Sequence, residues 1–241
     1  MPEQVSEPDG VALVPARAGS KGLEQKNLQQ LGGMSLVARA IAVAHRTAGI
    51  GSVIVSTDGE DIAAEAERHG ASVHWRPPEL ATDDAVVVDT IRHVLDGLRA
   101  ANACPPYCVL LEPTSPLRVP ADVEACLEAL RDGADSAATL TEAALHPNRA
   151  FRIDGDRLLP FIPGAVAWAP RQTLQPPAYQ LTGAAYAFAC DAFPTEGIGV
   201  LFGRIAPVLI PRERSLDIDD LFDLRVADAL FSDSRQPPLP G

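Results

Sequence analysis

Short apolar runs alternate with segments of helical periodicity along most of the chain, and this alternation constrains the fold most. The runs 11–14, 52–56 and 107–111 each have the length of a buried strand, and 71–75 and 136–140 are weaker runs of the same kind. Apolar residues recur three and four positions apart, as in helices, over 36–48, 60–69, 85–101 and 120–130. Strands that alternate with helices predict an α/β fold with a mostly parallel sheet and helices on both faces.

The alternation fails between residues 143 and 177, where six prolines interrupt any periodicity. Within this segment, 150–159 has Asp154-Gly155 at its centre, which predicts a hairpin turn. We expect a small arm or lid that leaves the sheet and exposes apolar side chains such as Phe161 and Trp168. A surface flap packed on its own domain is the alternative.

Beyond this segment the strand pattern resumes at 184–189 and 206–210, and a helical pattern follows over about 220–231. The sequence therefore predicts one domain over 11–232, with a terminal tail on each side at 1–10 and 233–241.

The net charge of −12 over 241 residues argues against broad binding to nucleic acid or to an anionic membrane. No apolar stretch approaches the roughly 20 residues that span a bilayer, and the acidic N-terminus lacks the features of a secretory signal. We therefore expect a soluble, cytoplasmic protein. The cysteines are scattered, which favours buried free thiols over a disulfide framework: Cys104, Cys108, Cys126 and Cys190.

A glycine-containing loop with three cations, Arg17, Lys21 and Lys26, follows the first predicted strand. Its spacing fits neither a P-loop nor a dinucleotide glycine triad. Loops at the ends of strands are favoured ligand positions in open α/β sheets, and three cations in such a loop can surround one triphosphate. They would stabilise charge on a departing pyrophosphate. The alternative is a solvated run of surface charge.

Near the other end of the chain, Asp217 and Asp219 flank Ile218. In an extended segment this spacing points both carboxylates to one face and Ile218 into the core. Two carboxylates on one face repel each other unless a cation lies between them, and Mg²⁺ is often held by carboxylates together with substrate phosphates. We predict a Mg²⁺ site here, although Asp219 can instead cap the final helix.

These residues lie in a longer ordered set of motifs between Val11 and Leu230. The segments are "VPARAGSKGLEQKNL", "VIVSTDGEDIAAEAERHGASVHWRPPELATD", "LLEPTSPLR", "PRQTL", "GAAYAF" and "RSLDIDDLFDLRVADAL". Together they resemble the CMP-N-acylneuraminate (sialate) synthetases, which are cytidylyltransferases that make CMP-activated acids from CTP. The resemblance implies a Rossmann-like nucleotidyltransferase sheet and a homodimer built through a small hairpin arm, here within 143–177.

The resemblance also implies roles for individual residues. Arg17, Lys21 and Lys26 would be the catalytic cations, and Asp217 and Asp219 the Mg²⁺ ligands. The implied CTP-binding residues are Arg17, Ala18, Ser20, Lys21, Lys26 and Asn27 at the triphosphate, with Arg76 and Ala85 at the cytosine and ribose.

The departures from the family pattern fall where the acceptor is expected. Glu112 stands where the family usually has Gln, and Gln180 stands where it usually has Arg, in the segment that also holds Thr182. The predicted acceptor-binding residues are Glu112, Arg171, Gln180 and Thr182. Because a buried unpaired polar or charged group is costly, such changes can alter what a pocket accepts. The acceptor is then either a nonulosonic (sialic-type) sugar acid or a phosphonate such as phosphonoformate, as in one branch that resembles the family.

Two other hypotheses remain open at this point. One is a guanylyl- or other nucleotidyltransferase of the same fold, since Val87 stands where many relatives carry a hydroxyl residue. The other is a non-catalytic nucleotide sensor, which predicts loss of the lysines or the aspartates, whereas both sets are present.

Overall fold

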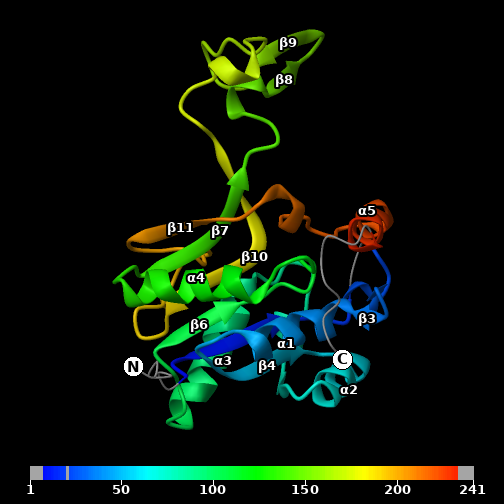
Figure 1. The fold of residues 1–241 in the computed structure, drawn as a ribbon, viewed down its shortest axis with the longest axis vertical. Coiled ribbons are helices and arrows are strands. Elements are labelled where there is room, and N and C mark those ends of the chain that lie inside the picture. Colours follow the sequence, from blue (N-terminus) through cyan, green and yellow to red (C-terminus); the bar gives the residue numbers. More distant parts are fainter. Residues whose placement is uncertain (1–7, 20–21, 233–241) are drawn as a thin grey trace, which may run out of the picture.

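The computed structural model describes residues 8–19 and 22–232, and its centre is a seven-stranded sheet of order β11-β7-β10-β6-β1-β4-β5 (Figure 1). The predicted Ser20, Lys21 and most of both tails lie outside the described residues. The strands of the sheet are β1 (Gly10–Pro15), β4 (Ile50–Thr57), β5 (Ser72–Trp75), β6 (Tyr107–Leu110), β7 (Ser136–Glu142), β10 (Tyr179–Ala189) and β11 (Ile205–Leu209).

The helices are α1 (Leu36–Arg46), α2 (Glu60–Arg68), α3 (Val87–Ala100), α4 (Pro120–Arg131) and α5 (Leu221–Ser232). Alternate residues of β1 point to opposite faces of the sheet. Ala12 and Val14 pack in a core with residues of α1, α2 and α4, whereas Val11 and Leu13 pack in a second core with residues of α3. The prediction of helices on both faces is therefore confirmed.

The sheet is mostly parallel, as predicted, and β10 is the strand that runs against its neighbours. It lies between β6 and β7 and is antiparallel to both. Its first residues pair with the end of β7, where Tyr179 is opposite Glu142 and Leu181 opposite Leu140. This pairing makes β10 begin five residues before the predicted run 184–189.

A crevice for a ligand follows from the order of the strands. From β1 the chain proceeds to β4 and β5 on one side, and then crosses to β6 on the other side of β1. The carboxyl ends of β1 and β6 lie side by side, and the segments that follow these two strands lead in opposite directions. Open α/β sheets bind ligands at such points. Arg17 follows β1 and Glu112 follows β6 at this point.

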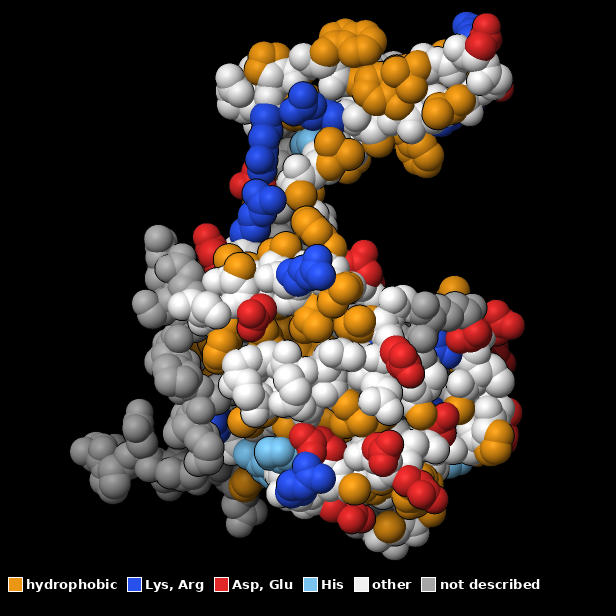
Figure 2. Space-filling model, turned by 90° about the vertical axis from the view of Figure 1, so that its right-hand side faces the viewer, with side chains coloured by type: hydrophobic (Ala, Val, Ile, Leu, Met, Phe, Trp, Pro, Cys, Tyr) orange, Lys and Arg blue, Asp and Glu red, His pale blue; other side chains and the backbone are white. Residues whose placement is uncertain are grey.

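The segment that interrupts the alternation forms an arm that stands away from the sheet (Figures 1 and 2). Its tip is the predicted hairpin, made of β8 (Phe151–Asp154) and β9 (Arg157–Pro160). The arm extends from the paired ends of β7 and β10 and exposes apolar side chains, with Phe161 63% and Trp168 76% exposed. A flap packed on its own domain does not describe this arrangement.

Three smaller observations complete the fold. The four cysteines are free thiols, and all except the partly exposed Cys104 are buried as predicted. No helix in the described part of the chain combines the length and the apolar character needed to cross a bilayer. Gly10 belongs to β1, and Asp9 forms an ion pair with Arg131 at 2.6 Å, so both residues of the predicted N-terminal tail contact the sheet or its helices.

Candidate functional site

A cavity of about 530 Å³ opens at the carboxyl ends of β1 and β6. It gathers residues from segments far apart in the sequence: the loop after β1, the segment before α3, the connection after β6 and the segment before α5. Eight of the predicted site residues line it, namely Arg17, Lys26, Asn27, Arg76, Ala85, Glu112, Asp217 and Asp219.

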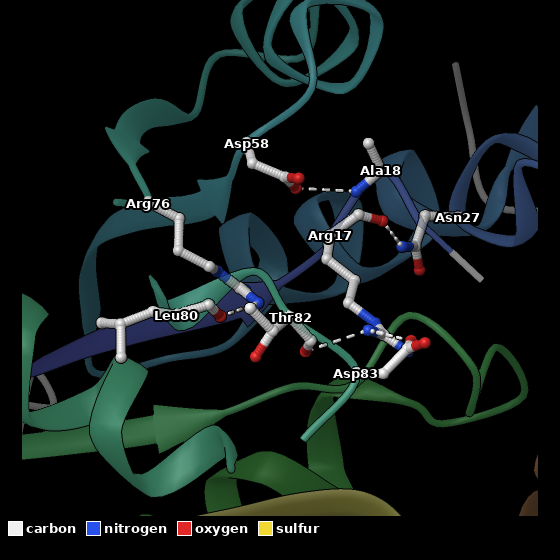
Figure 3. Close-up of polar contacts among 8 residues, drawn as sticks. All are labelled: Arg17, Ala18, Asn27, Asp58, Arg76, Leu80, Thr82 and Asp83. Atoms are coloured by element: carbon white, nitrogen blue, oxygen red, sulfur yellow. Dashed lines mark hydrogen bonds and ion pairs between the residues drawn. The ribbon is translucent and has the colours of Figure 1, made fainter. Parts of the chain in front are cut away.

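Side-chain hydrogen bonds fix the course of the loop after β1 (Figure 3). The buried Asn27 donates from Nδ2 to the carbonyl of Arg17 at 2.9 Å. From the end of β4, Asp58 accepts the backbone N–H of Ala18 at 2.8 Å. Asn27 and Ala18, both predicted to bind the triphosphate, therefore also position the loop backbone.

The guanidinium group of Arg17 reaches across to the segment that precedes α3 (Figure 3). It forms an ion pair with Asp83 at 2.8 Å and donates to the carbonyl of Thr82 at 3.1 Å. Arg17 thus links the predicted triphosphate loop to the predicted cytosine side of the cavity.

Arg76 lies on that same side and is partly buried. It donates from Nη2 to the carbonyl of Ser56 at 3.0 Å, and burial lowers the pKa of its guanidinium. Its Nε is buried and has no hydrogen-bond partner within the described residues. A buried polar group without a partner is costly, and Arg76 lines the cavity with this donor unused.

The two aspartates of the predicted metal site have the expected arrangement. Asp217 and Asp219 line the cavity, and Ile218 between them is completely buried. Lys26 joins the loop after β1 to this segment, with its Nζ 3.2 Å from Asp219 Oδ1. The alternative role for Asp219 is wrong: Asp220 caps α5, accepting the backbone N–H groups of Phe222 at 2.7 Å and of Asp223 at 3.0 Å.

These carboxylates fit a Mg²⁺ ion that shares its coordination with a substrate. Among the described residues, no group of three or more His, Cys, Asp or Glu side chains is arranged to hold a metal by itself. Two aspartates on one cavity wall leave the remaining ligand positions to phosphate oxygens and water, which is the coordination that Mg²⁺ prefers.

Glu112 lies at the border between this cavity and a second one. Burial raises the pKa of its carboxyl to about 7, and the nearby charge of Asp217 adds to this effect. Arg118 opposes it, and the buried Arg118 donates from Nη2 to the carbonyl of Glu112. The carboxyl also packs against Gly183, where a Cβ would lie 2.7 Å from Glu112 Oε2.

The second cavity has a volume of about 670 Å³ and lies between β10 and α5. Glu112 and Asp217 line both cavities, so the two spaces meet at these carboxylates. Gln180 and Thr182 also line the second cavity, although their side chains have partners in the fold. Gln180 Oε1 accepts the N–H of Ala144 at 2.9 Å, and the buried Thr182 hydroxyl lies 2.8 Å from that of Thr139.

Arg171 is the predicted acceptor residue that the chain does not bring to this cavity. It lies at the base of the arm in the 3-10 turn η4 (Arg171–Thr173) and forms an ion pair with Glu142 at 2.8 Å. Its place in the arm separates it from the second cavity within one chain.

A family model described as cytidylyltransferase matches residues 11–155 of the chain. The chain belongs to this family. Its relatives include the CMP-N,N'-diacetyllegionaminic acid synthase of Legionella pneumophila, with 35% identity over 60% of this chain and 62% of the relative. An N-acylneuraminate cytidylyltransferase of Streptococcus agalactiae is 29% identical over 92% of this chain and 54% of the relative. The chain thus spans between about half and two thirds of the length of these two relatives.

Among solved structures, the cytidylyltransferase resembles a CMP:2-keto-3-deoxy-manno-octonic acid synthetase complexed with CTP. The TM-score is 0.66, the identity is 18%, and the match covers 93% of this chain and 98% of the other. At this identity the likeness shows the fold, and it confirms the predicted Rossmann-like nucleotidyltransferase sheet.

Sequence reasoning missed two carboxylates that organise the site of the cytidylyltransferase. Asp58 holds the loop backbone at Ala18, and Asp83 pairs with Arg17. Asp58 follows directly after β4, the neighbour of β1. Polar residues at the carboxyl ends of adjacent parallel strands meet at one edge of the sheet, and this signal could have identified it.

We expect Glu112→Gln to change how stability depends on pH. Because the pKa of Glu112 rises from 4.5 to about 7 on folding, the folded state binds this proton more tightly, and stability is lost as pH rises from about 4.5 through about 7. The amide does not titrate. The variant should therefore match the wild type near pH 4.5 and exceed its free energy of unfolding by up to about 3 kcal/mol at pH 8.

Urea unfolding at both pH values, without CTP or Mg²⁺, measures this difference. Glu196→Gln, at an exposed carboxylate outside both cavities, is the control. Parallel pH profiles for the Glu112 variant and the wild type would contradict the burial of a carboxyl with a raised pKa.

Proposed function

We propose that this cytidylyltransferase transfers CMP from CTP to an acidic acceptor and releases pyrophosphate. The observation that carries the proposal is the meeting of two cavities at Glu112 and Asp217. The first cavity has the cations, the loop and the predicted metal ligands that suit CTP. The second has the volume for an acceptor, so that the reacting atoms would meet at the shared border.

Residues of the first cavity would bind and orient CTP. Lys26 and Arg17 would exchange their present partners, Asp219 and Asp83, for phosphate oxygens, since both ion pairs are only partly buried. Lys21 and Ser20 are proposed for the same triphosphate from the sequence. Arg76, with its unpartnered Nε, would lie beside the cytosine and ribose, as would Ala85.

Asp217 and Asp219 would hold Mg²⁺. The bound ion would neutralise charge that develops on the phosphates as pyrophosphate leaves. Their shared wall in the first cavity supports this assignment.

The transfer itself is an in-line substitution at the α-phosphorus. A bond forms between the acceptor oxygen and this phosphorus, and the bond to the oxygen bridging the α- and β-phosphates breaks, with its electron pair leaving on pyrophosphate. For a hydroxyl acceptor we propose that Glu112 takes the proton. Its carboxyl borders both cavities and has a pKa of about 7, which is suited to a general base near neutral pH.

A nonulosonic acid is the acceptor we favour. The relatives from Legionella pneumophila and Streptococcus agalactiae are named for such acids. The second cavity, at about 670 Å³, falls in the range of sites for ligands the size of a drug and exceeds the needs of a one-carbon phosphonate.

Pyrophosphate release with CTP and Mg²⁺ tests the proposal. The panel of acceptors contains N-acetylneuraminate, N,N'-diacetyllegionaminate and phosphonoformate, and GTP replaces CTP in a parallel series. Turnover of a nine-carbon acid with CTP is expected. Turnover of phosphonoformate alone would place the enzyme in the phosphonate branch, turnover with GTP alone would overturn CTP as donor, and no turnover with tight CTP binding would indicate a sensor.

We also propose a homodimer that forms through the arm. The exposed apolar side chains of the arm, among them Ile153, Phe161 and Trp168, need a covering surface, and a second copy of the chain supplies one (Figure 2). We expect sedimentation equilibrium to give twice the chain mass of 25.5 kDa, and Trp168→Asp to lower it toward the monomer. A monomeric wild type would contradict this proposal.

A further inference from the structure

Arg212 is the only lysine or arginine among the described residues that line the second cavity. It begins the 3-10 turn η5 (Arg212–Arg214), which precedes the segment of Asp217 and Asp219. Its side chain is exposed and forms no ion pair or hydrogen bond with the described residues. The guanidinium group is therefore available to a ligand.

The side chains of two neighbouring arginines already have hydrogen-bond partners within the chain. Arg214 binds Asp122 through two hydrogen bonds, with Nη2 at 2.7 Å and Nε at 3.0 Å. Arg118 is 4% exposed and donates to the backbone of Glu112. Neither guanidinium group can turn to the cavity without leaving a buried partner unpaired, which is costly.

The other charges of the cavity make a cation necessary for an acidic ligand. Glu112, Glu213 and Asp217 line the same space and would repel an anion. Glu112 and Asp217 lie at the border with the first cavity, whereas Arg212 lines the second cavity alone. An anionic group in this cavity would therefore be attracted to Arg212 and repelled by the carboxylates at the border.

We propose that Arg212 binds the anionic group of the acceptor and selects acids over neutral analogues. A guanidinium group presents a planar pair of donors that matches the two oxygens of a carboxylate or the oxygens of a phosphonate. This inference rests on the proposed function and names the residue that determines its acceptor class. Arg212 is a specificity residue and lies away from the predicted CTP site.

Arg212→Gln, Arg212→Lys and the control Arg225→Gln test this role. Arg225 lies on α5, is exposed and lines neither cavity. In Arg212→Gln the KM for the accepted acid should rise by about 10- to 100-fold, because one charge-assisted interaction is lost. The KM for CTP should stay within about twofold, and Arg212→Lys should recover part of the loss.

Paired substrates sharpen the test. The wild type should favour the acid over its methyl ester by at least about tenfold in kcat/KM, and Arg212→Gln should reduce this ratio to near one. A ratio unchanged from that of Arg225→Gln would overturn the role of Arg212 while leaving the proposed function in place. Failure of the wild type with every acid of the panel would instead overturn the proposed function.

A binding measurement keeps the inference testable without turnover. Calorimetry with the same acids in the presence of CMP, which carries no pyrophosphate to release, compares the wild type with Arg212→Gln. Binding that weakens at least about tenfold in the variant supports the role. Equal affinities, or no binding of any of these acids by the wild type, overturn it.

Discussion

Asp217→Asn is expected to lower kcat by about 10³-fold, which is the size of effect seen when a major electrostatic contact in a transition state is removed. Asp217 is proposed as a Mg²⁺ ligand and lines both cavities. An amide oxygen carries no net charge, so the variant would bind the ion weakly and leave the departing pyrophosphate less stabilised. The folded state should tolerate the change, because Asp217 is exposed and Ile218 remains buried.

Initial rates of pyrophosphate release over a Mg²⁺ titration measure this effect, and excess Mg²⁺ should restore part of the activity. Asp228→Asn, at an exposed position of α5 outside both cavities, is the control. Retention of more than about one tenth of the wild-type kcat with an unchanged Mg²⁺ dependence would contradict the metal assignment.

Much of the fold could be predicted because its signals are local. The apolar runs of β1, β4 and β6 and the helical periodicity of α1 and α3 each extend over one element, and together they require a parallel sheet covered on both faces. The direction of β10 has no such signal. It depends on where the chain returns after the arm, and therefore on pairing with β6 and β7 across a long separation in sequence.

The residues of the site also fall into those with a local sequence signal and those without one. Arg17, Asp217 and Asp219 could be found because each lies in a short pattern of residue types that has a chemical purpose. The partners of these residues could not be found so readily, since the ion pair of Arg17 with Asp83 joins positions 66 residues apart. Arg212 belongs to no recognised sequence pattern, and its proposed role follows only from its place in the lining of the second cavity.

Gly22 lets the loop after β1 pack closely against the segment of Asp219. A Cβ at this position would lie 2.5 Å from the backbone oxygen of Asp219, which is closer than such atoms approach. The segment of Asp219 cannot yield easily. Its N–H donates to Asp223 Oδ2 at 3.0 Å, and the N–H of Ile218 donates to the carbonyl of Thr114 at 2.8 Å. In Gly22→Ala we therefore expect the loop after β1 to move away from the aspartates.

A displacement of about 1 Å between the triphosphate loop and the metal ligands should lower kcat/KM for CTP by about 10²-fold, because the reacting groups would no longer be aligned. Gly19→Ala is the matched control in the same loop, since a Cβ there would meet no atom of the described residues within 4 Å. It adds the same methyl group without the clash and should have a much smaller effect. Equal losses in the two variants would mean that loop flexibility, rather than the packing of Gly22 on Asp219, sets the geometry of the site.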